Sequence, residues 1–344
     1  MNMDAMEKKQ ITLKDIAKAL DISPSTVSRS LKDHPGISAE TKEMVQKYAQ
    51  EHKYKPNALA LSLRMQKSNT IGVIIPEIVH YFFSSVLSGI EKEAEKNGYK
   101  VLFCQSNEDY EREIICTETV LSAHVCGVLV SVSKKTAKFQ HFQEIIDNNI
   151  PLVFFDRICT GINTDKVVVD DYTGAFNAVE YLINTNCKRI VLLGGNPILA
   201  ISNNRRMGYE DALRKYKIPV EKSLMFICDT VALAQEIVPE ILQQENKPDA
   251  FFAINDEVAS VCINITNSFG LKIPDDISIC GFTNSYISQF TSPNLTTVDQ
   301  RGFEVGSTAA RLLINRLKGI ETKEGIVSRV IKTKLVVRDS TRKI

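Results

Sequence analysis

Apolar positions near the start of the chain repeat with the spacing of short helices. Residues 13, 16, 17 and 20 are apolar and fall on one helical face. Thr12 precedes them and Asp15 follows it at the spacing of a capping box, so the pattern predicts a helix over 13–20. Ser23-Pro24 is a start signal for a second helix that runs to about residue 31, and Ser38 starts a third over 39–52.

The second of these helices has one apolar and one polar face. Val27 and Leu31 fall on the side that meets the first helix, whereas Ser25, Ser28 and Arg29 fall on the opposite side. Two short helices joined by a tight turn, with a polar outer face on the second, predict a helix-turn-helix whose second helix fits a major groove. Any small helical hairpin gives a similar pattern, so the pattern alone leaves that alternative open.

From residue 69 onward, short apolar runs alternate with amphipathic segments. The runs are TIGVII, VLFCQ, GVLVSV and PLVFF, then VVVD, RIVLLGG, FFAI and ISICGF, with helices expected over 84–97 and 109–122 and between other runs. This alternation is typical of parallel sheets covered on both faces, and the length favours two sheets. The predicted fold class is α/β, preceded by an all-α head. The segment 322–344 has the pattern of final strands rather than of a heptad helix, which favours a dimer over a tetramer.

Composition and charge indicate a kind of partner only for the head. The chain of 344 residues is 44% hydrophobic and 24% charged, as in ordinary globular proteins of two or three domains. Residues 1–67 carry 12 Lys and Arg against 8 Asp and Glu, whereas the rest carries 30 against 33. The basic head favours a polyanionic partner. The first residues lack an apolar signal region, and no run approaches the roughly 18 apolar residues of a membrane span, so we expect a cytoplasmic protein without membrane contact.

Motifs for catalysis and cofactor binding are missing from the sequence. It contains no glycine-rich nucleotide loop and no nucleophile elbow, and Gly194-Gly195 alone is too weak a signal. The five histidines lack metal-ligand spacing, and the eight cysteines form no C-x-x-C pair, so we expect reduced core cysteines. These observations argue against a dehydrogenase or sugar kinase and predict no catalytic residue, metal or cofactor. A secreted sugar-binding protein is the other alternative, against which the basic head and the lack of a signal region argue.

The head resembles the DNA-binding domain of the LacI/GalR family of repressors over residues 11–64, ITLKDIAKALDISPSTVSRSLKDHPGISAETKEMVQKYAQEHKYKPNALALSLR. The resemblance implies that the second helix reads base edges and that a hinge helix enters the minor groove, where a leucine is wedged between base pairs. An arginine can donate two hydrogen bonds to guanine, and an inserted apolar side chain bends the duplex. Pro24 departs from the usual pattern and offers only apolar contact. The residues expected to contact DNA are Thr12, Pro24, Ser25, Thr26, Ser28, Arg29, Asn57, Ala60 and Leu63.

The body resembles the periplasmic-binding-protein-like sensor of the same family, on matches such as NTIGVIIPEI, VFFDR, VVVDDYTGA, RRMGYEDAL, FFAINDEVA and SPNLTTVDQ. Ligands of such folds bind at the carboxyl ends of the strands, between two lobes. The resemblance and the polar residues at those ends imply an effector cleft lined by Tyr81, Phe82, Asp156, Arg157, Asn203, Arg205, Asn255, Asp256 and Thr283.

Two departures from the family pattern bear on the effector. His80-Tyr81 stands where the family usually has Asn-Pro, and Thr283 stands where it usually has Asp. The loss of that carboxylate would leave Arg157 and Arg205 unbalanced. We therefore expect a small carbohydrate-like effector, with an anionic sugar acid or sugar phosphate as the specific hypothesis.

These observations predict three parts of the chain. Residues 1–55 form a helix-turn-helix DNA-binding domain, 56–68 a hinge helix and linker, and 69–344 an effector-binding and dimerisation domain. Within the last part, lobe 1 is expected over about 69–168 and 300–327, and lobe 2 over about 169–299 and 328–344. Because one short reading helix contacts few bases, we expect a homodimer on a pseudo-palindromic double-stranded DNA operator. Repression under allosteric control by the effector is the expected activity, and activation is its alternative.

Overall fold

The computed structural model describes residues 11–54, 68–320 and 325–344. The chain divides between Ser68 and Asn69 into two compact units, a helical head and an α/β body. The expected hinge residues Asn57, Ala60 and Leu63 lie outside the described residues.

Three helices form the head, and each begins where its cap predicts. They are α1 (Leu13–Ala19), α2 (Pro24–Ser30) and α3 (Ala39–Glu51), each ending one residue before the expected end. Their N-terminal backbone N–H groups are satisfied by the side chains of Thr12, Ser23 and Ser38. The buried side chains of the core come from all three helices and are Ile16, Ala17, Val27, Val45 and Ala49.

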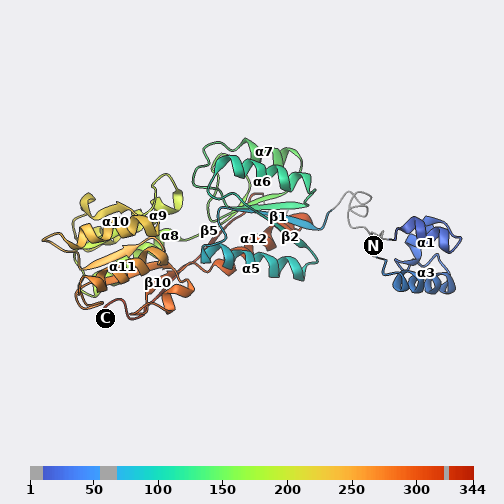
Figure 1. The fold of residues 1–344 in the computed structure, drawn as a ribbon. Helices are drawn as coiled ribbons and strands as arrows, with labels where there is room; N and C mark the ends of the chain where they lie inside the picture. The colour runs from blue at the N-terminus through green and yellow to red at the C-terminus, as the bar shows by residue number, and fades with distance from the viewer. Residues whose placement is uncertain (1–10, 55–67, 321–324) are drawn as a thin grey trace, which may run out of the picture. The chain divides into compact units, whose positions relative to one another are not determined.

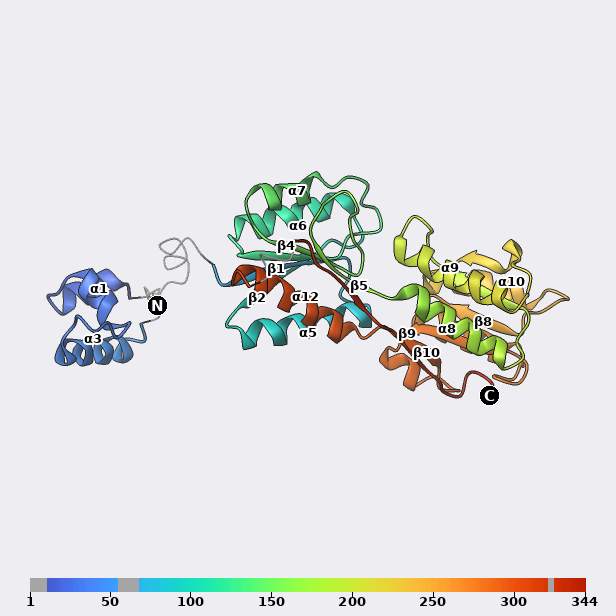
Figure 2. The ribbon, with the colours of Figure 1, turned by 180° about the vertical axis from the view of Figure 1, so that it is seen from behind.

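The first lobe of the body is built on a six-stranded parallel sheet. Its strands, in spatial order, are β11 (Ser328–Ile331), β5 (Asp165–Val169), β4 (Leu152–Phe155), β3 (Gly127–Val130), β1 (Thr70–Ile75) and β2 (Lys100–Gln105). Helices α6 (Tyr110–Ser122) and α7 (Gln140–Asp147) cover one face (Figure 1). Helices α5 (Tyr81–Lys96) and α12 (Gly302–Leu317) cover the other and lie side by side in both views (Figures 1 and 2).

The α5–α12 contact depends on glycines because the two backbones approach closely. A Cβ added at Gly89 would overlap the carbonyl oxygen of Phe303, and one added at Gly306 would overlap that of Val86. Helix α5 begins at Tyr81, three residues before the start that the apolar pattern predicts at Ser84. The expected start is wrong because the first turn, Tyr81-Phe82-Phe83, is itself apolar and packs partly into the core.

The second lobe repeats the same architecture. Its sheet, in spatial order, contains β12 (Lys334–Val336), β10 (Thr296–Asp299), β9 (Ser278–Thr283), β8 (Ala250–Ala253), β6 (Ile190–Gly194) and β7 (Met225–Ile227), and only β12 pairs antiparallel. Helices α8 (Asp171–Asn184) and α9 (Ala200–Lys215) cover one face. Helices α10 (Val231–Leu242) and α11 (Asp256–Ser268) cover the other (Figure 1). Two short 3-10 helices, η1 (Lys222–Leu224) and η2 (Tyr286–Gln289), complete the lobe.

The chain passes between the two lobes after β5, after β10 and after β11. The sequence-based boundary at residue 328 is therefore wrong, because β11 pairs with β5 in the sheet of lobe 1. The last crossing lies between Ile331 and Lys334 instead. Within the described ranges, no helix is both long and apolar enough to cross a membrane.

Candidate functional site

Helix α2 presents the polar face that the sequence predicts for a DNA reader. Ser23 caps the helix by accepting a hydrogen bond from the backbone N–H of Thr26 at 3.1 Å, and its hydroxyl lies 2.7 Å from that of Ser25. Val27 is fully buried against the head core, so the helix is fixed in one rotation about its axis. Pro24, Ser25 and Arg29 are exposed on the outer side.

The other expected DNA contacts of the head differ in exposure. Thr26 and Ser28 are half-buried on α2. Thr12 is exposed at the start of α1, but its hydroxyl already donates to Asp15 at 2.7 Å within the capping box. Asn57, Ala60 and Leu63 remain predictions because they lie outside the described residues.

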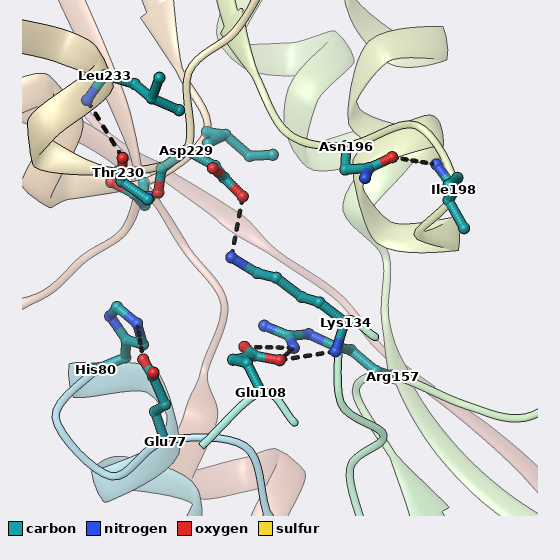
Figure 3. A network of polar contacts seen from close by, with 12 residues as sticks. Glu77, His80, Glu108, Lys134, Arg157, Asn196, Ile198, Asp229, Thr230 and Leu233 are labelled. Carbon is teal, nitrogen blue, oxygen red and sulfur yellow. Dashed lines mark hydrogen bonds and ion pairs between the residues drawn. The ribbon is translucent and has the colours of Figure 1, made fainter. Parts of the chain in front are cut away.

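In the body, Arg157 follows β4 and is bound by a carboxylate that the sequence analysis did not name. Its Nη1 donates to both carboxylate oxygens of Glu108 at 2.7 and 2.8 Å (Figure 3). Glu108 also accepts from the backbone N–H of Lys134 at 2.7 Å, so one carboxylate joins the ends of three strands. Glu108 and Lys134 follow the runs VLFCQ and GVLVSV, so a search of every strand end would have found them.

Arg205 lies on α9 and is only 6% exposed. Its Nε donates to Asp171 Oδ1 at 2.7 Å and its Nη1 to the carbonyl oxygen of Ile254 at 2.7 Å, while the guanidinium carbon stands 3.9 Å from the centre of the Phe282 ring. Burial raises the pKa of Asp171, against the lowering effect of Arg205. A cavity of about 110 Å³ in lobe 2 is lined by three residues of α9, Ser202, Arg205 and Arg206, and by apolar side chains of β6, β7 and β8.

The expectation of two unbalanced arginines is therefore wrong. Arg157 is neutralised by Glu108, and Arg205 by Asp171. The partners lie 49 and 34 residues away along the chain and reach the arginines only through the fold. The site as a whole carries no excess positive charge from these two residues.

Asp156 is buried directly after β4, and both its backbone dihedral angle φ and its side-chain pKa depart from ordinary values. Its φ of +58° lies in the left-handed region, which turns the chain out of the strand. Burial raises its pKa to about 7, although Arg157, whose Nε is 4.0 Å from Asp156 Oδ2, lowers it.

This titration gives a pH-dependent stability. The raised pKa means that folding favours the protonated carboxyl, so the contribution of Asp156 is fully present below pH 3.8 and is lost as the pH rises toward about 7. We expect Asp156→Asn to gain stability relative to the parent protein as the pH rises from about 4 to about 7, with a plateau above. Urea unfolding of both proteins at a series of pH values measures this difference, in which other groups largely cancel. A difference that is constant with pH would contradict the assignment.

The remaining expected effector residues are held in different ways. Asn255 caps α11 through Val258 N–H and donates to the carbonyl oxygen of Asp229, and Asn203 accepts from Arg206. Thr283 donates to Gln300 at 3.0 Å. Asp256 is fully buried and accepts from Ser285 N–H and Thr297 Oγ1, with burial raising its pKa to about 6. Asp256 thus supports lobe 2 internally.

The aromatic residues divide between the core and the lobe boundary. Phe82 is 7% exposed in the core of lobe 1, which does not fit the expected aromatic wall. Tyr81 is half-buried, and its ring meets that of Tyr286 from lobe 2 edge to face at 4.8 Å between centres. Within the described residues, no group of His, Cys, Asp and Glu side chains could hold a metal ion.

Comparison with known proteins gives matches along the whole chain. The model of bacterial regulatory proteins of the lacI family matches residues 12–57, and that of the periplasmic binding protein-like domain matches residues 179–341. The HTH-type transcriptional repressor CytR of Escherichia coli (strain K12) is 32% identical over 332 residues, covering 96% of each chain. This relative is a repressor rather than an enzyme, in agreement with the sequence analysis.

Two solved structures share the fold. The lac repressor dimer bound to operator and the anti-inducer ONPF has a TM-score of 0.85 at 22% identity, covering 97% of this chain and 99% of that one. A periplasmic binding protein/LacI transcriptional regulator from Alkaliphilus metalliredigens QYMF, complexed with D-xylulofuranose, has a TM-score of 0.70 at 27% identity, covering 80% of this chain and 100% of that one.

Proposed function

Because the chain belongs to the LacI family of bacterial regulatory proteins, we propose that it is a transcriptional repressor whose homodimer binds a pseudo-palindromic operator under allosteric control by a small carbohydrate-like effector. Such a protein acts in the cytoplasm, where its DNA is. The observation that carries the proposal is the outer face of α2, where a helix capped by Ser23 and packed on the head core through Val27 exposes Ser25 and Arg29 to solvent. An arginine on such a helix can bond the major-groove edge of guanine.

Selection of duplexes from a random library, followed by gel-shift titration at physiological salt, tests this proposal. We expect enrichment of a two-fold symmetric site with half-sites about one helical turn apart. Binding that shows no preference over random competitor would contradict sequence-specific regulation. A reporter gene behind the selected site then distinguishes repression from activation.

The proposed dimer is supported by exposed apolar side chains on lobe 2. Around η2, Tyr286 is 65% exposed, Ile287 39% and Phe290 81%. Clustered exposed apolar side chains of this size mark interaction surfaces. The lac repressor of similar fold is a dimer.

Replacing Phe290 by serine should weaken this dimer roughly tenfold or more, because an aromatic side chain loses its burial in both protomers. Sedimentation equilibrium measures the dissociation constant. Ile198→Ser is the matched control, since Ile198 is 84% exposed but follows β6. A monomeric parent protein would contradict the dimer, and equal effects of the two variants would contradict this location.

For the effector, the paired arginines favour a neutral polyhydroxylated sugar over a sugar acid or sugar phosphate. Carboxylate and amide oxygens at the strand ends accept hydroxyl hydrogens, and Tyr81 offers an aromatic face. The D-xylulofuranose complex of the similar Alkaliphilus protein supports the class. Calorimetry with neutral pentoses and hexoses and with their acids and phosphates tests it. Binding of only the sugar acids or phosphates would contradict a neutral effector. Binding of none of these compounds would contradict a carbohydrate effector.

A further inference from the structure

An ion pair joins the two lobes beside the candidate effector residues. Lys134 lies on the loop after β3 in lobe 1, and its Nζ is 2.9 Å from Oδ2 of Asp229, the second residue after β7 in lobe 2. Figure 3 shows the lysine side chain extended across from one lobe to the other. The side chains are 34% and 19% exposed, so the pair is partly shielded from water.

The loop that carries Lys134 is held in place by two carboxylates, of which Glu108 is half-buried and Glu113 fully buried. Glu108 accepts from Lys134 N–H while it binds Arg157, as Figure 3 shows. Glu113, fully buried on α6, accepts from Ser133 N–H at 2.7 Å, from Thr136 Oγ1 at 2.7 Å and from His141 Nε2 at 3.1 Å. The residues on both sides of Lys134 are therefore fixed, which lowers the entropy lost when its side chain pairs.

The aspartate end is also held in place. The carbonyl oxygen of Asp229 accepts from Asn255 Nδ2 at 3.1 Å, and Asn255 in turn caps α11. The same amide is an expected effector contact. The ion pair therefore connects one group of candidate effector residues, Arg157 with Glu108, to another, Asn255.

Two further contacts join residues of the two lobes. His80 Nε2 lies 2.9 Å from Glu77 of its own lobe, and its Nδ1 lies 4.0 Å from Glu257 of lobe 2. The Tyr81 and Tyr286 rings also meet there. These contacts are longer or uncharged, so the Lys134–Asp229 pair is the strongest polar link among them.

We propose that Lys134 and Asp229 form a latch, an ion pair that holds the two lobes together in the arrangement of this structure, with Glu108 as the positioning residue that holds both Lys134 and Arg157. The role of the latch rests on the proposed function, since a ligand enters between the lobes only when the latch opens. The latch thereby sets how much of the protein is ready to admit or release its effector.

Pulsed electron–electron double resonance on the full-length protein tests the latch without a known effector. Spin labels carried by noncanonical amino acids at the exposed positions Glu118 of lobe 1 and Asn204 of lobe 2 report the distance between the lobes and avoid the native cysteines. We expect Lys134→Met and Asp229→Asn each to raise the population of a second distance roughly threefold. The double variant should add little, because one interaction is already lost.

Matched variants make the result specific. Lys135→Met changes the exposed neighbour on the same loop and should leave the distances unchanged. The reversed pair, Lys134→Asp with Asp229→Lys, should restore the parent distribution, and Glu108→Gln should broaden it. Unchanged distances in Lys134→Met, or no recovery in the reversed pair, would overturn the latch. Gel shifts on the same samples report DNA binding separately, so loss of the latch and failure of the proposed function are distinguishable.

Discussion

Arg205→Met is expected to destabilise the body by about 3–5 kcal/mol, because it leaves the Asp171 carboxylate buried without its cation. Asp171 is 2% exposed, and Arg205 also donates to the carbonyl oxygen of Ile254. The loss therefore affects both the start of α8 and the end of β8. Urea unfolding followed by far-UV circular dichroism measures the free energy of unfolding.

The adjacent arginine on the same helix is the matched control. Arg206 pairs with Glu210 one turn away, and its side chain is 42% exposed. Arg206→Met should therefore cost about 1 kcal/mol or less. Adding Asp171→Asn to Arg205→Met should recover part of the loss, since the uncompensated charge is removed. If the Arg205 and Arg206 variants lower the free energy of unfolding equally, the buried Arg205–Asp171 pair contributes no more to stability than the exposed Arg206–Glu210 pair.

Arg29→Ala is expected to weaken specific DNA binding by about 1–3 kcal/mol at each half-site, because a bidentate contact to a base is lost. A symmetric dimer loses this contact twice. Selectivity should relax at one base position per half-site, while salt-dependent binding to random duplex persists. Binding-site selection and titration at fixed salt measure both effects.

An exposed lysine elsewhere in the head separates base reading from charge. Lys47 lies on α3 and is exposed, so Lys47→Ala removes one positive charge and leaves α2 unchanged. Its effect should be small and equal on selected and random duplexes. If Arg29→Ala shows the same selected sequence as the parent protein, Arg29 does not read a base.

Local signals made the head predictable and long-range pairing limited the prediction for the body. Thr12, Ser23 and Ser38 mark the helix starts because a cap acts within three residues of itself. The sheets also followed from alternation, and membership of the LacI family agrees with the motifs. By contrast, the short strands 328–331 and 334–336 have similar patterns, and nothing in either states which sheet it joins.

The charge balance of the candidate site shows the same limit. Thr283 indicates a missing carboxylate, but the sequence does not show that Glu108 and Asp171 supply two others. The first pair forms because the ends of β2 and β4 meet at one edge of the sheet of lobe 1, and the second because α8 and α9 pack side by side on the sheet of lobe 2. A residue's type predicts which chemistry it can perform, whereas its partner depends on the register of elements far away in the chain.

The three crossings between the lobes have a consequence for synthesis of the protein. Strand β11 completes the first sheet beside β5, and α12 packs on α5, so the first lobe needs segments that leave the ribosome only after most of the second lobe. The head, whose core lies within residues 16–49, can fold while the body is still being translated. A nascent chain that stalls before residue 328 would thus expose a finished DNA-binding unit attached to an unfinished body, a natural target for chaperones and proteases.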